Sequence, residues 1–511
     1  MKSKLFSYLK IFLIIICGFS ISLCFRPVTQ NGFLTKIEAD AWFLVEDSAW
    51  IIQTGKYILE YGIPATDIFS WTSSDKSFIV YQWLFEIIVA FFDQSFGREI
   101  MIKVFMLLTF SAFFILPAIY ASKQKVPFLI TFFVCFFTAL FGIKFSSIRP
   151  GIISCLFLGF QYILIQSLKE KKIKLKFALP LFGLMYLIWG NCHTGVFLGL
   201  AFILIFIIGD ILQEKNMYVF NPVKSEINSS NQVKPLNIKF YFLIMLLGFC
   251  MSLINPYGIG IYSHLLNISL QTEMNGTIAE LQRSSPAEFI LILEIFCLMI
   301  FINVKKCMSA QDFLFILILS ILGLLNYRFL MWAFLFYAFI FPKALYNFYL
   351  YKKQEKENSL HRFIDSFQNY KIYGKLAILG AILVFLYFPL PLAAHYGICN
   401  KYKKAIETFK ITENLFNDST IGSCILLQKP QQKVFIDTRL DFYGQNFVIP
   451  WREVLFLDNP NWRNYLKEKN VKIIFIENHY PLTKILKELD KVKIIYSDEY
   501  STIFDVSALL Y

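Results

Sequence analysis

Eleven long apolar blocks divide most of this 511-residue chain, and each is near the length of a membrane-spanning helix. They lie at about 5–25, 100–120, 126–145, 150–168, 175–191, 195–213, 239–255, 287–304, 311–325, 328–348 and 373–393. A helix needs about 20 mainly apolar residues to cross a bilayer, and it satisfies its backbone hydrogen bonds within the segment. The chain is therefore predicted to be an α-helical polytopic membrane protein.

The composition excludes two other classes of protein. Hydrophobic types make up 57% of the chain and charged residues only 17%, whereas an average soluble domain carries roughly 25% charged residues. A disordered chain would be poor in apolar residues. The net charge of +13, from 49 Lys and Arg against 36 Asp and Glu, does not indicate a nucleic-acid partner, because most of the Lys residues lie in short loops between apolar blocks. There they determine membrane topology.

One further apolar block, 78–97, contains Gln82, Glu86 and Asp93. Its apolar residues recur at helical spacing, which is typical of an amphipathic helix in the membrane interface. If this block does not cross, all the Lys-rich loops fall on the same side as the basic N-terminus; if it crosses, the basic 169–176 loop moves outside. The positive-inside rule thus favours eleven spans, with the N-terminus in the cytoplasm and the C-terminus outside.

This topology places three regions outside: 26–99, 256–286 and a C-terminal domain, 394–511, which follows the membrane domain, 1–393. In the C-terminal domain, predicted helices at 401–416, 461–469 and 482–490 alternate with β-rich runs at 434–436, 473–476 and 494–496. This alternation predicts a small α/β unit. Cys399 and Cys424 lie in it, and an extracytoplasmic location would permit a disulfide between them.

The first outer region begins with four carboxylates within ten residues, Glu38, Asp40, Glu46 and Asp47. A carboxylate near an apolar boundary loses solvation, which raises its pKa toward that of a useful base. Such a group is able to take the proton from an acceptor hydroxyl. The simpler interpretation is a solvated acidic loop.

After Asp47, the residues 50–61 are predicted to form an amphipathic helix, with Trp50, Tyr57 and Tyr61 on one face. Gly62 and Pro64 end it. Aromatic stripes near a bilayer are usually interfacial anchors, and this one is also suited to border a lipid groove. A polar loop beginning at Asp67 follows.

Four basic or ionisable residues fall near the outer ends of predicted spans: Arg149, His193, Arg283 and Arg328. Positive charges on this side run against the positive-inside bias. A site for a phosphate or diphosphate would explain them, because the guanidinium fork matches phosphate oxygens. The alternative is that each pairs with a carboxylate or extends to the lipid headgroups.

Short segments in a fixed order resemble motifs of a group of bacterial multi-pass proteins with the GT-C glycosyltransferase architecture. The segments are 47–55 (DSAWIIQTG), 67–72 (DIFSWT), 82–84 (QWL), 149–150 (RP), 189–195 (WGNCHTG), 255–258 (NPYG), 280–286 (ELQRSSP) and 434–444 (VFIDTRLDFYG). Within 47–55 the second Trp and the His of the group's pattern are replaced. GT-C enzymes include protein O-mannosyltransferases, lipid A aminoarabinose transferases and oligosaccharyltransferases.

The resemblance implies transfer of a sugar from a polyprenyl-phosphate donor to a glycan, lipid or protein acceptor, with inversion, at the outer face of the bacterial cytoplasmic membrane. In GT-C enzymes the long first outer loop carries juxtamembrane helices and the catalytic Asp, which makes Asp47 the first candidate base and Asp40 the alternative. Arg149, His193, Arg283 and Arg328 would hold the lipid phosphate.

Asp67 and Gln82 are candidates for a substrate loop, because both lie in segments that match the group's motifs. Asp437, Arg439 and Asp441 are interpreted as a structural network of the C-terminal domain. A neighbouring acidic pair is able to bind a divalent cation, as in oligosaccharyltransferases. Transferases that use lipid monophosphates need none, so no metal or other cofactor is expected.

Two other classes of function stay open, one enzymatic and one non-enzymatic. A polymerase or ligase of lipid-diphosphate-linked glycans would also use outer-face Arg residues, but usually has its large loop between late spans. A transporter would usually show paired halves with interrupted helices, and no such symmetry is seen in the sequence. A non-catalytic assembly scaffold would tolerate loss of Asp47, Asp40 and Arg149 together.

Overall fold

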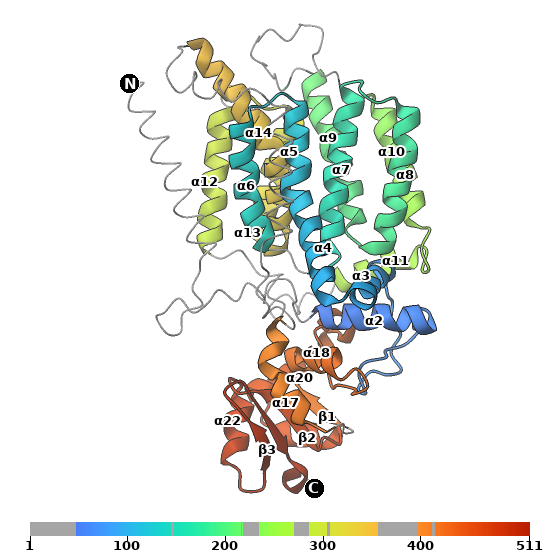
Figure 1. Cartoon of the computed structure of the whole chain (residues 1–511), viewed down its shortest axis with the longest axis vertical. Coiled ribbons are helices and arrows are strands. Elements are labelled where there is room, and N and C mark those ends of the chain that lie inside the picture. Colours follow the sequence, from blue (N-terminus) through green and yellow to red (C-terminus); the bar gives the residue numbers. More distant parts are fainter. Residues whose placement is uncertain are drawn as a thin grey trace.

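The computed structural model describes residues 47–144, 148–215, 217, 235–269, 286–303, 307–355, 397–410 and 414–510. Most of these residues form a bundle of apolar helices, and a small mixed α/β unit lies below one end of it (Figure 1). The predicted first and last spans, 5–25 and 373–393, lie outside the described residues.

Helices occur at the other nine predicted spans, and they run side by side along the long axis of Figure 1. They are α4 (Arg98–Phe110), continued by a π-helical turn (Ser111–Ile115) and α5 (Leu116–Lys123), then α6 (Phe128–Lys144), α7 (Gly151–Lys169), α8 (Leu175–Cys192), α9 (Val196–Glu214), α10 (Ile238–Ser252), α12 (Pro286–Asn303), α13 (Ala310–Leu325) and α14 (Leu330–Glu355). A 3₁₀ turn, η5 (Tyr327–Phe329), precedes α14.

Five helical segments of the described chain are long and apolar enough to cross a membrane. They are Arg98–Lys123, Gly151–Lys169, Leu175–Cys192, Val196–Glu214 and Tyr327–Lys353. Shorter apolar helices lie at Phe128–Ala139, Ile238–Ser252, Leu291–Ile300 and Ala310–Leu325. The chain is thus mostly helical with several candidate spans, and the count of eleven stays a prediction.

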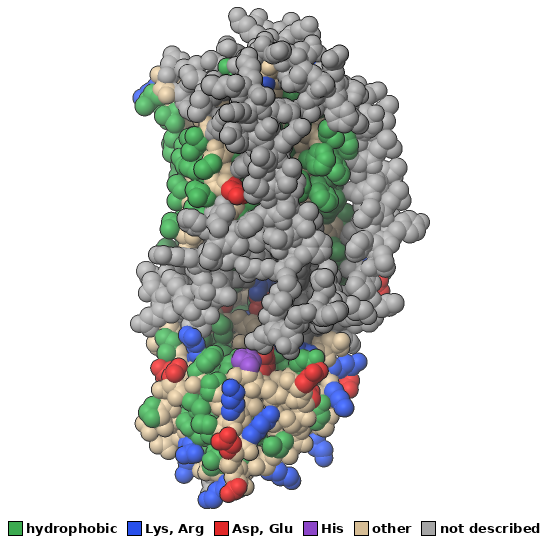
Figure 2. Space-filling model, turned by 90° about the vertical axis from the view of Figure 1, so that its left-hand side faces the viewer, with side chains coloured by type: hydrophobic (Ala, Val, Ile, Leu, Met, Phe, Trp, Pro, Cys, Tyr) green, Lys and Arg blue, Asp and Glu red, His purple; other side chains and the backbone are tan. Residues whose placement is uncertain are grey.

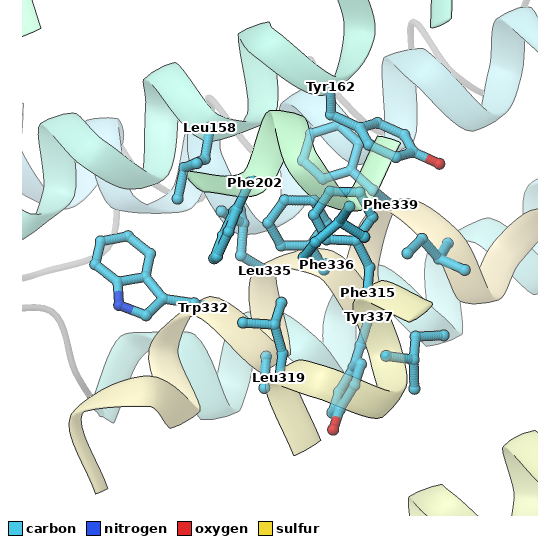
Figure 3. Close-up of a cluster of buried hydrophobic side chains, with 14 of the residues drawn as sticks. Leu158, Tyr162, Phe202, Phe315, Leu319, Trp332, Leu335, Phe336, Tyr337 and Phe339 are labelled. Carbon is cyan, nitrogen blue, oxygen red and sulfur yellow. The ribbon is translucent and has the colours of Figure 1, made fainter. Parts of the chain in front are cut away.

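Aromatic side chains fill the centre of the bundle between α7, α9, α13 and α14 (Figure 3). The rings of Phe315 and Phe336 stack with centroids 4.4 Å apart, and Tyr162 meets Phe336 edge-on at 5.9 Å. Offset and edge-to-face pairs of this kind add about 0.5–1.5 kcal/mol beyond the burial of their surface. The abundance of Phe in the sequence therefore serves to pack the helices together.

Three shorter helices lie at one end of the bundle: α2 (Asp47–Tyr61), α3 (Trp83–Phe96) and α11 (Gly260–Ser269). In Figure 1, α2 lies across that end. α3 packs closely on α2, since a Cβ at Gly55 would stand 2.0 Å from the backbone oxygen of Glu86. α2 ends before Gly62, which has a φ of 85°, as predicted. Within the 78–97 block only Trp83–Phe96 is helical, as α3, and Gly97 separates it from the long helix that follows.

The C-terminal unit, residues 397–510 without 411–413, contains a four-stranded sheet of order β1-β2-β4-β3. Its elements are η7 (Gly397–Tyr402), α17 (Lys403–Thr408), β1 (Leu415–Asn417), α18 (Ser419–Gln428), α19 (Leu440–Tyr443), α20 (Gln445–Phe456), α21 (Trp462–Glu468), β2 (Ile473–Glu477), α22 (Pro481–Glu488), β3 (Lys493–Ser497), β4 (Ser501–Asp505) and α23 (Ser507–Leu510). β1 and β2 are parallel, with Leu415 opposite Ile473, and the other pairs are antiparallel.

Two predicted elements of this unit are wrong. The helix predicted over 401–416 stops at Thr408, and Leu415–Asn417 forms β1, because these residues are fully buried and pair with β2. The run 434–436 does not join the sheet. Val434 instead bridges to Ser70, with hydrogen bonds from Val434 N to Phe69 O (3.0 Å) and from Trp71 N to Val434 O (3.1 Å).

The C-terminal unit packs directly on the juxtamembrane part of the chain. α18 lies against α2, and their side chains share one apolar core that includes Ile51, Ile52 and Ile425. Cys399 and Cys424 form a disulfide that ties η7 to α18. Figure 2 shows charged side chains gathered over the C-terminal unit, whereas the described bundle surface on this face is mainly apolar.

Candidate active site at the membrane surface

Asp47 and Arg149 form an ion pair where α2 meets the helical bundle. Asp47 is the first residue of α2, and Arg149 stands two residues before α7. The Nη2 atom of Arg149 lies 2.6 Å from Oδ2 of Asp47. The indole Nε1 of Trp50 donates a hydrogen bond to the other carboxylate oxygen at 3.4 Å. Both charged side chains keep partial exposure, 21% for Asp47 and 32% for Arg149, so the carboxylate is held in place and is still accessible.

His193 lies just beyond the end of α8, at the same end of the bundle. Its Nδ1 is 2.6 Å from Oγ of Ser154, which also accepts a hydrogen bond from Nε1 of Trp189 at 2.6 Å. Burial, followed by the positive charge of Arg328, lowers the pKa of His193 to about 3. The imidazole is therefore neutral. When Ser154 donates its proton to Nδ1, the ring carries its own proton on Nε2, where it is a hydrogen-bond donor.

The contact between Ser154 and His193 requires a glycine at position 195. A Cβ at this position would stand 2.3 Å from Oγ of Ser154 and 2.6 Å from Nδ1 of His193. Any side chain here would push the two groups apart, so the glycine of the 189–195 segment is required for close packing around His193.

Three of the matched segments meet at the same end of the bundle. The indole Nε1 of Trp83 donates to Oδ1 of Asn191 at 2.9 Å, which joins α3 to the end of α8. The amide of Val80 donates to the hydroxyl of Tyr257 at 2.9 Å. Segments 82–84, 189–195 and 255–258, far apart in the sequence, thus hold α3 against the bundle.

Arg328 and Asp441 complete the group of charges. Arg328 lies in η5 and Asp441 in α19 of the C-terminal unit. Burial, followed by the negative charge of Asp47, raises the pKa of Asp441; a backbone hydrogen bond from Phe442 and the positive charges of Arg328 and His264 offset part of this rise. These groups are therefore electrostatic neighbours, although they come from four elements. Sequence analysis assigned Asp441 to a structural network with Asp437 and Arg439; in the structure Arg439 pairs with Asp437 and Asp67, and the charges of Asp47 and Arg328 act on Asp441.

Asp67 and Gln82, the predicted substrate-loop residues, make structural contacts. Asp67 is buried and accepts hydrogen bonds from Ser70 Oγ (2.5 Å), Ser70 N (2.9 Å) and Arg439 Nη2 (2.8 Å). Arg439 also pairs with Asp437 at 2.6 Å. Gln82 is buried and donates to Oε1 of Glu86 at 3.0 Å.

Two candidates cannot be placed, because Asp40 and Arg283 lie outside the described residues. Among the residues that the structure describes, no group of three or more His, Cys, Asp or Glu side chains is arranged to hold a metal ion. The described candidate residues of the site are therefore Asp47, Arg149, His193 and Arg328. Asp441, in the matched 434–444 segment, is an electrostatic neighbour of Asp47 and Arg328 that sequence reasoning did not connect to them.

The burial of Glu86 can be tested by the pH dependence of the free energy of unfolding. It is fully buried on α3, its Oε2 has no partner among the described residues, and burial raises its pKa to about 8. The unfolded chain releases this proton near pH 4.3, so the free energy of unfolding should fall by about 1.4 kcal/mol per pH unit between about pH 4.3 and pH 8. Glu86→Gln keeps the shape of the protonated acid and removes this dependence.

In thermal unfolding of the detergent-solubilised protein, the Glu86→Gln variant should match the wild type at about pH 4 and be clearly more stable at about pH 8. The exposed Glu60→Gln variant on α2 is the control and should show no such divergence. An equal difference between Glu86→Gln and wild type at both pH values would contradict the assignment of a neutral Glu86.

The chain was compared with protein-family models, curated protein sequences and solved structures. No family model and no curated protein sequence matches the chain. The structure is similar to the crystal structure of the oligosaccharyltransferase of Archaeoglobus fulgidus in the apo form, with a TM-score of 0.46, 10% identity and coverage of 91% of this chain and 69% of that one. It is also similar to the oligosaccharyltransferase AglB of the same organism in complex with an inhibitory peptide and a dolichol-phosphate, with a TM-score of 0.41, 12% identity and coverage of 93% and 70%.

Proposed function

We propose that this protein transfers a sugar from a polyprenyl-phosphate donor to an acceptor at the outer face of the membrane, with Asp47 as the base. The observation that carries the proposal is the Asp47–Arg149 ion pair at the first turn of a juxtamembrane helix, with a neutral His193 and its electrostatic neighbour Arg328 near the ends of the bundle helices. This arrangement provides a carboxylate that can take a proton from the acceptor. It also provides hydrogen-bond donors for a phosphate at the end of an apolar helical bundle.

The reaction follows from the roles of these groups. The Asp47 carboxylate takes the proton of an acceptor hydroxyl, and the oxygen attacks the anomeric carbon of the sugar. The bond from that carbon to the phosphate oxygen breaks with inversion, and the lipid phosphate leaves with the electron pair. Arg149, Arg328 and the Nε2–H of His193 stabilise the charge that develops on the phosphate.

Because Asp47 is paired with Arg149, binding of the lipid-linked donor would directly affect Asp47, the proposed base. In the free protein Arg149 neutralises Asp47 at 2.6 Å. A lipid phosphate that binds Arg149 competes for the same guanidinium and releases the carboxylate to accept a proton. Binding of the donor thereby prepares the base, and an empty site keeps it neutralised.

The disulfide between Cys399 and Cys424 supports the predicted topology. Disulfides persist in oxidising compartments and are rare in the cytosol. We therefore place the C-terminal unit and the site outside the cytoplasm, with the N-terminus inside and the chain in the bacterial cytoplasmic membrane. The reaction as proposed needs no metal ion.

Binding of a polyprenyl phosphate tests the phosphate site. The Arg149→Gln variant in detergent micelles should bind it about 10–100-fold more weakly than the wild type, because a hydrogen bond to a charged group contributes about 1.5–3 kcal/mol. The matched control is Arg452→Gln, which changes an exposed residue of α20. The corresponding polyprenol, which lacks the phosphate, should bind both variants and the wild type equally. Equal affinity of wild type and Arg149→Gln for the phosphate would contradict the proposed site.

A further inference from the structure

The two ring nitrogens of His193 have different surroundings. Nδ1 lies 2.6 Å from Oγ of Ser154, a buried residue in the first turn of α7. His193 itself is half-buried, and no hydrogen bond joins its Nε2 to any residue that the structure describes. Because Ser154 follows Arg149 by only five residues, this contact holds the ring near the start of α7, where Arg149 pairs with Asp47. Nδ1 is thus occupied, and Nε2 is the nitrogen that is left for a ligand.

Trp189 determines the direction of the hydrogen bonds at Ser154. An indole nitrogen is only a donor, and Nε1 of Trp189 lies 2.6 Å from the same Ser154 Oγ. Oγ therefore accepts from Trp189, and its own proton points to Nδ1 of His193. If Nδ1 carried a proton instead, Oγ would accept two bonds and the Ser154 proton would have no acceptor among the described residues. Such a buried, unpaired donor is costly.

Close packing keeps the indole of Trp189 in this orientation. Trp189 is fully buried, and its ring contacts those of Tyr186 and Phe157, with centroids 5.9 and 5.7 Å away. A Cβ at Gly199 would stand 2.5 Å from Cζ3 of the indole. The donor on Trp189 therefore has little room to turn away from Ser154.

We propose that Ser154, oriented by Trp189, is a positioning residue that keeps the proton of His193 on Nε2. This inference rests on the proposed function and specifies the form of the imidazole that meets the lipid phosphate. A neutral imidazole has one donor and one acceptor nitrogen. With the proton on Nε2 it donates to a phosphate oxygen, whereas the other tautomer would turn a lone pair toward the phosphate. The tautomer thus decides whether His193 attracts or repels the donor.

The ¹⁵N NMR spectrum of the histidine rings reports the tautomer directly. The full chain is labelled with [¹⁵N]histidine and studied in micelles at pH 7 without a ligand; among its five His residues, His193 is the one whose signals vanish in His193→Gln. We expect the wild type to be protonated on Nε2 alone. Ser154→Ala and Trp189→Phe should each add the Nδ1-protonated form. Ser154→Thr, which keeps the hydroxyl, and the control Ser263→Ala, at an exposed position of α11, should give the wild-type signals.

Titration with a polyprenyl phosphate connects the tautomer to the site. Ser154→Ala should bind it about 2–10-fold more weakly than the wild type, the usual net contribution of one hydrogen bond. Its affinity for the corresponding polyprenol, and both affinities of Ser263→Ala, should equal those of the wild type.

Three results would overturn the proposal: a wild-type His193 that is protonated on Nδ1, a tautomer that is the same in the wild type, Ser154→Ala and Trp189→Phe, or an equal loss of affinity for polyprenyl phosphate and polyprenol in Ser154→Ala. The last would indicate a merely structural role for Ser154. If the wild type does not bind polyprenyl phosphate at all, the proposed function fails, and the NMR spectra still decide whether Ser154 sets the tautomer.

Discussion

Replacement of Asp47 by Asn is expected to lower the rate of sugar transfer by a factor of about 10²–10⁴, the range that a positioned general base contributes. Asn has the same shape as Asp and still accepts a hydrogen bond from Trp50 Nε1, which donates to Asp47 at 3.4 Å in the native chain. The variant should therefore fold, but it cannot take a proton from an acceptor hydroxyl. Product formed per unit of protein, measured in envelope glycans by mass spectrometry, gives the rate.

Asp75→Asn is the matched control for this change, because Asp75 is an exposed acid of the same outer region. It should transfer sugar at the wild-type rate. If Asp47→Asn retains more than about a third of the wild-type rate while Asp75→Asn is unchanged, Asp47 is not the base, and the alternative candidate Asp40 becomes the residue to replace.

The second large effect concerns attachment of the C-terminal unit. Arg439→Met should destabilise the protein by about 3–5 kcal/mol, the usual consequence of removing one partner from a buried ion pair. Arg439 is 2% exposed and binds Asp67 and Asp437, whose side chains are fully buried. Its guanidinium also lies 4.8 Å from the ring centres of Phe69, Phe78 and Phe442. The substitution leaves two buried carboxylates without their cation.

Urea unfolding in detergent measures this loss, and limited proteolysis shows whether residues 397–510 become accessible. Arg452→Met, at an exposed position of α20, should change stability by less than about 0.5 kcal/mol. The triple variant Arg439→Met, Asp67→Asn, Asp437→Asn removes all three charges and should recover part of the stability. A triple variant less stable than Arg439→Met alone would contradict the assignment of the loss to unpaired carboxylates.

The sequence predicted the membrane part of the fold well, because bilayer length and helical spacing are local properties. Helices occupy nine predicted spans, and Gly62 ends α2 as expected. The fold of the C-terminal unit was harder to predict from the sequence. β4 was missed and β1 was assigned to a helix, because the state of Leu415–Asn417 depends on pairing with β2, which lies about 60 residues away in the sequence.

The candidate site, too, was only partly predictable from the sequence. Topology alone brought Asp47 and Arg149 to one face, but their direct contact depends on how α2 crosses the end of the bundle. Asp437 and Arg439 are two residues apart, and no local pattern shows that Arg439 joins Asp437 to Asp67, which lies more than 350 residues away in the sequence. Ser154 gave no sequence signal, since its role appears only when α7 and α8 lie side by side.

The pool of lipid-linked sugars tests the central claim most directly. Membranes of cells that carry the wild type, Asp47→Asn or Asp75→Asn as the only copy are extracted, and their polyprenyl-phosphate sugars are identified by mass spectrometry. The account predicts that one such lipid accumulates with Asp47→Asn, while the envelope glycan that contains its sugar disappears. Identical lipid pools and identical envelope glycans in all three strains would contradict it.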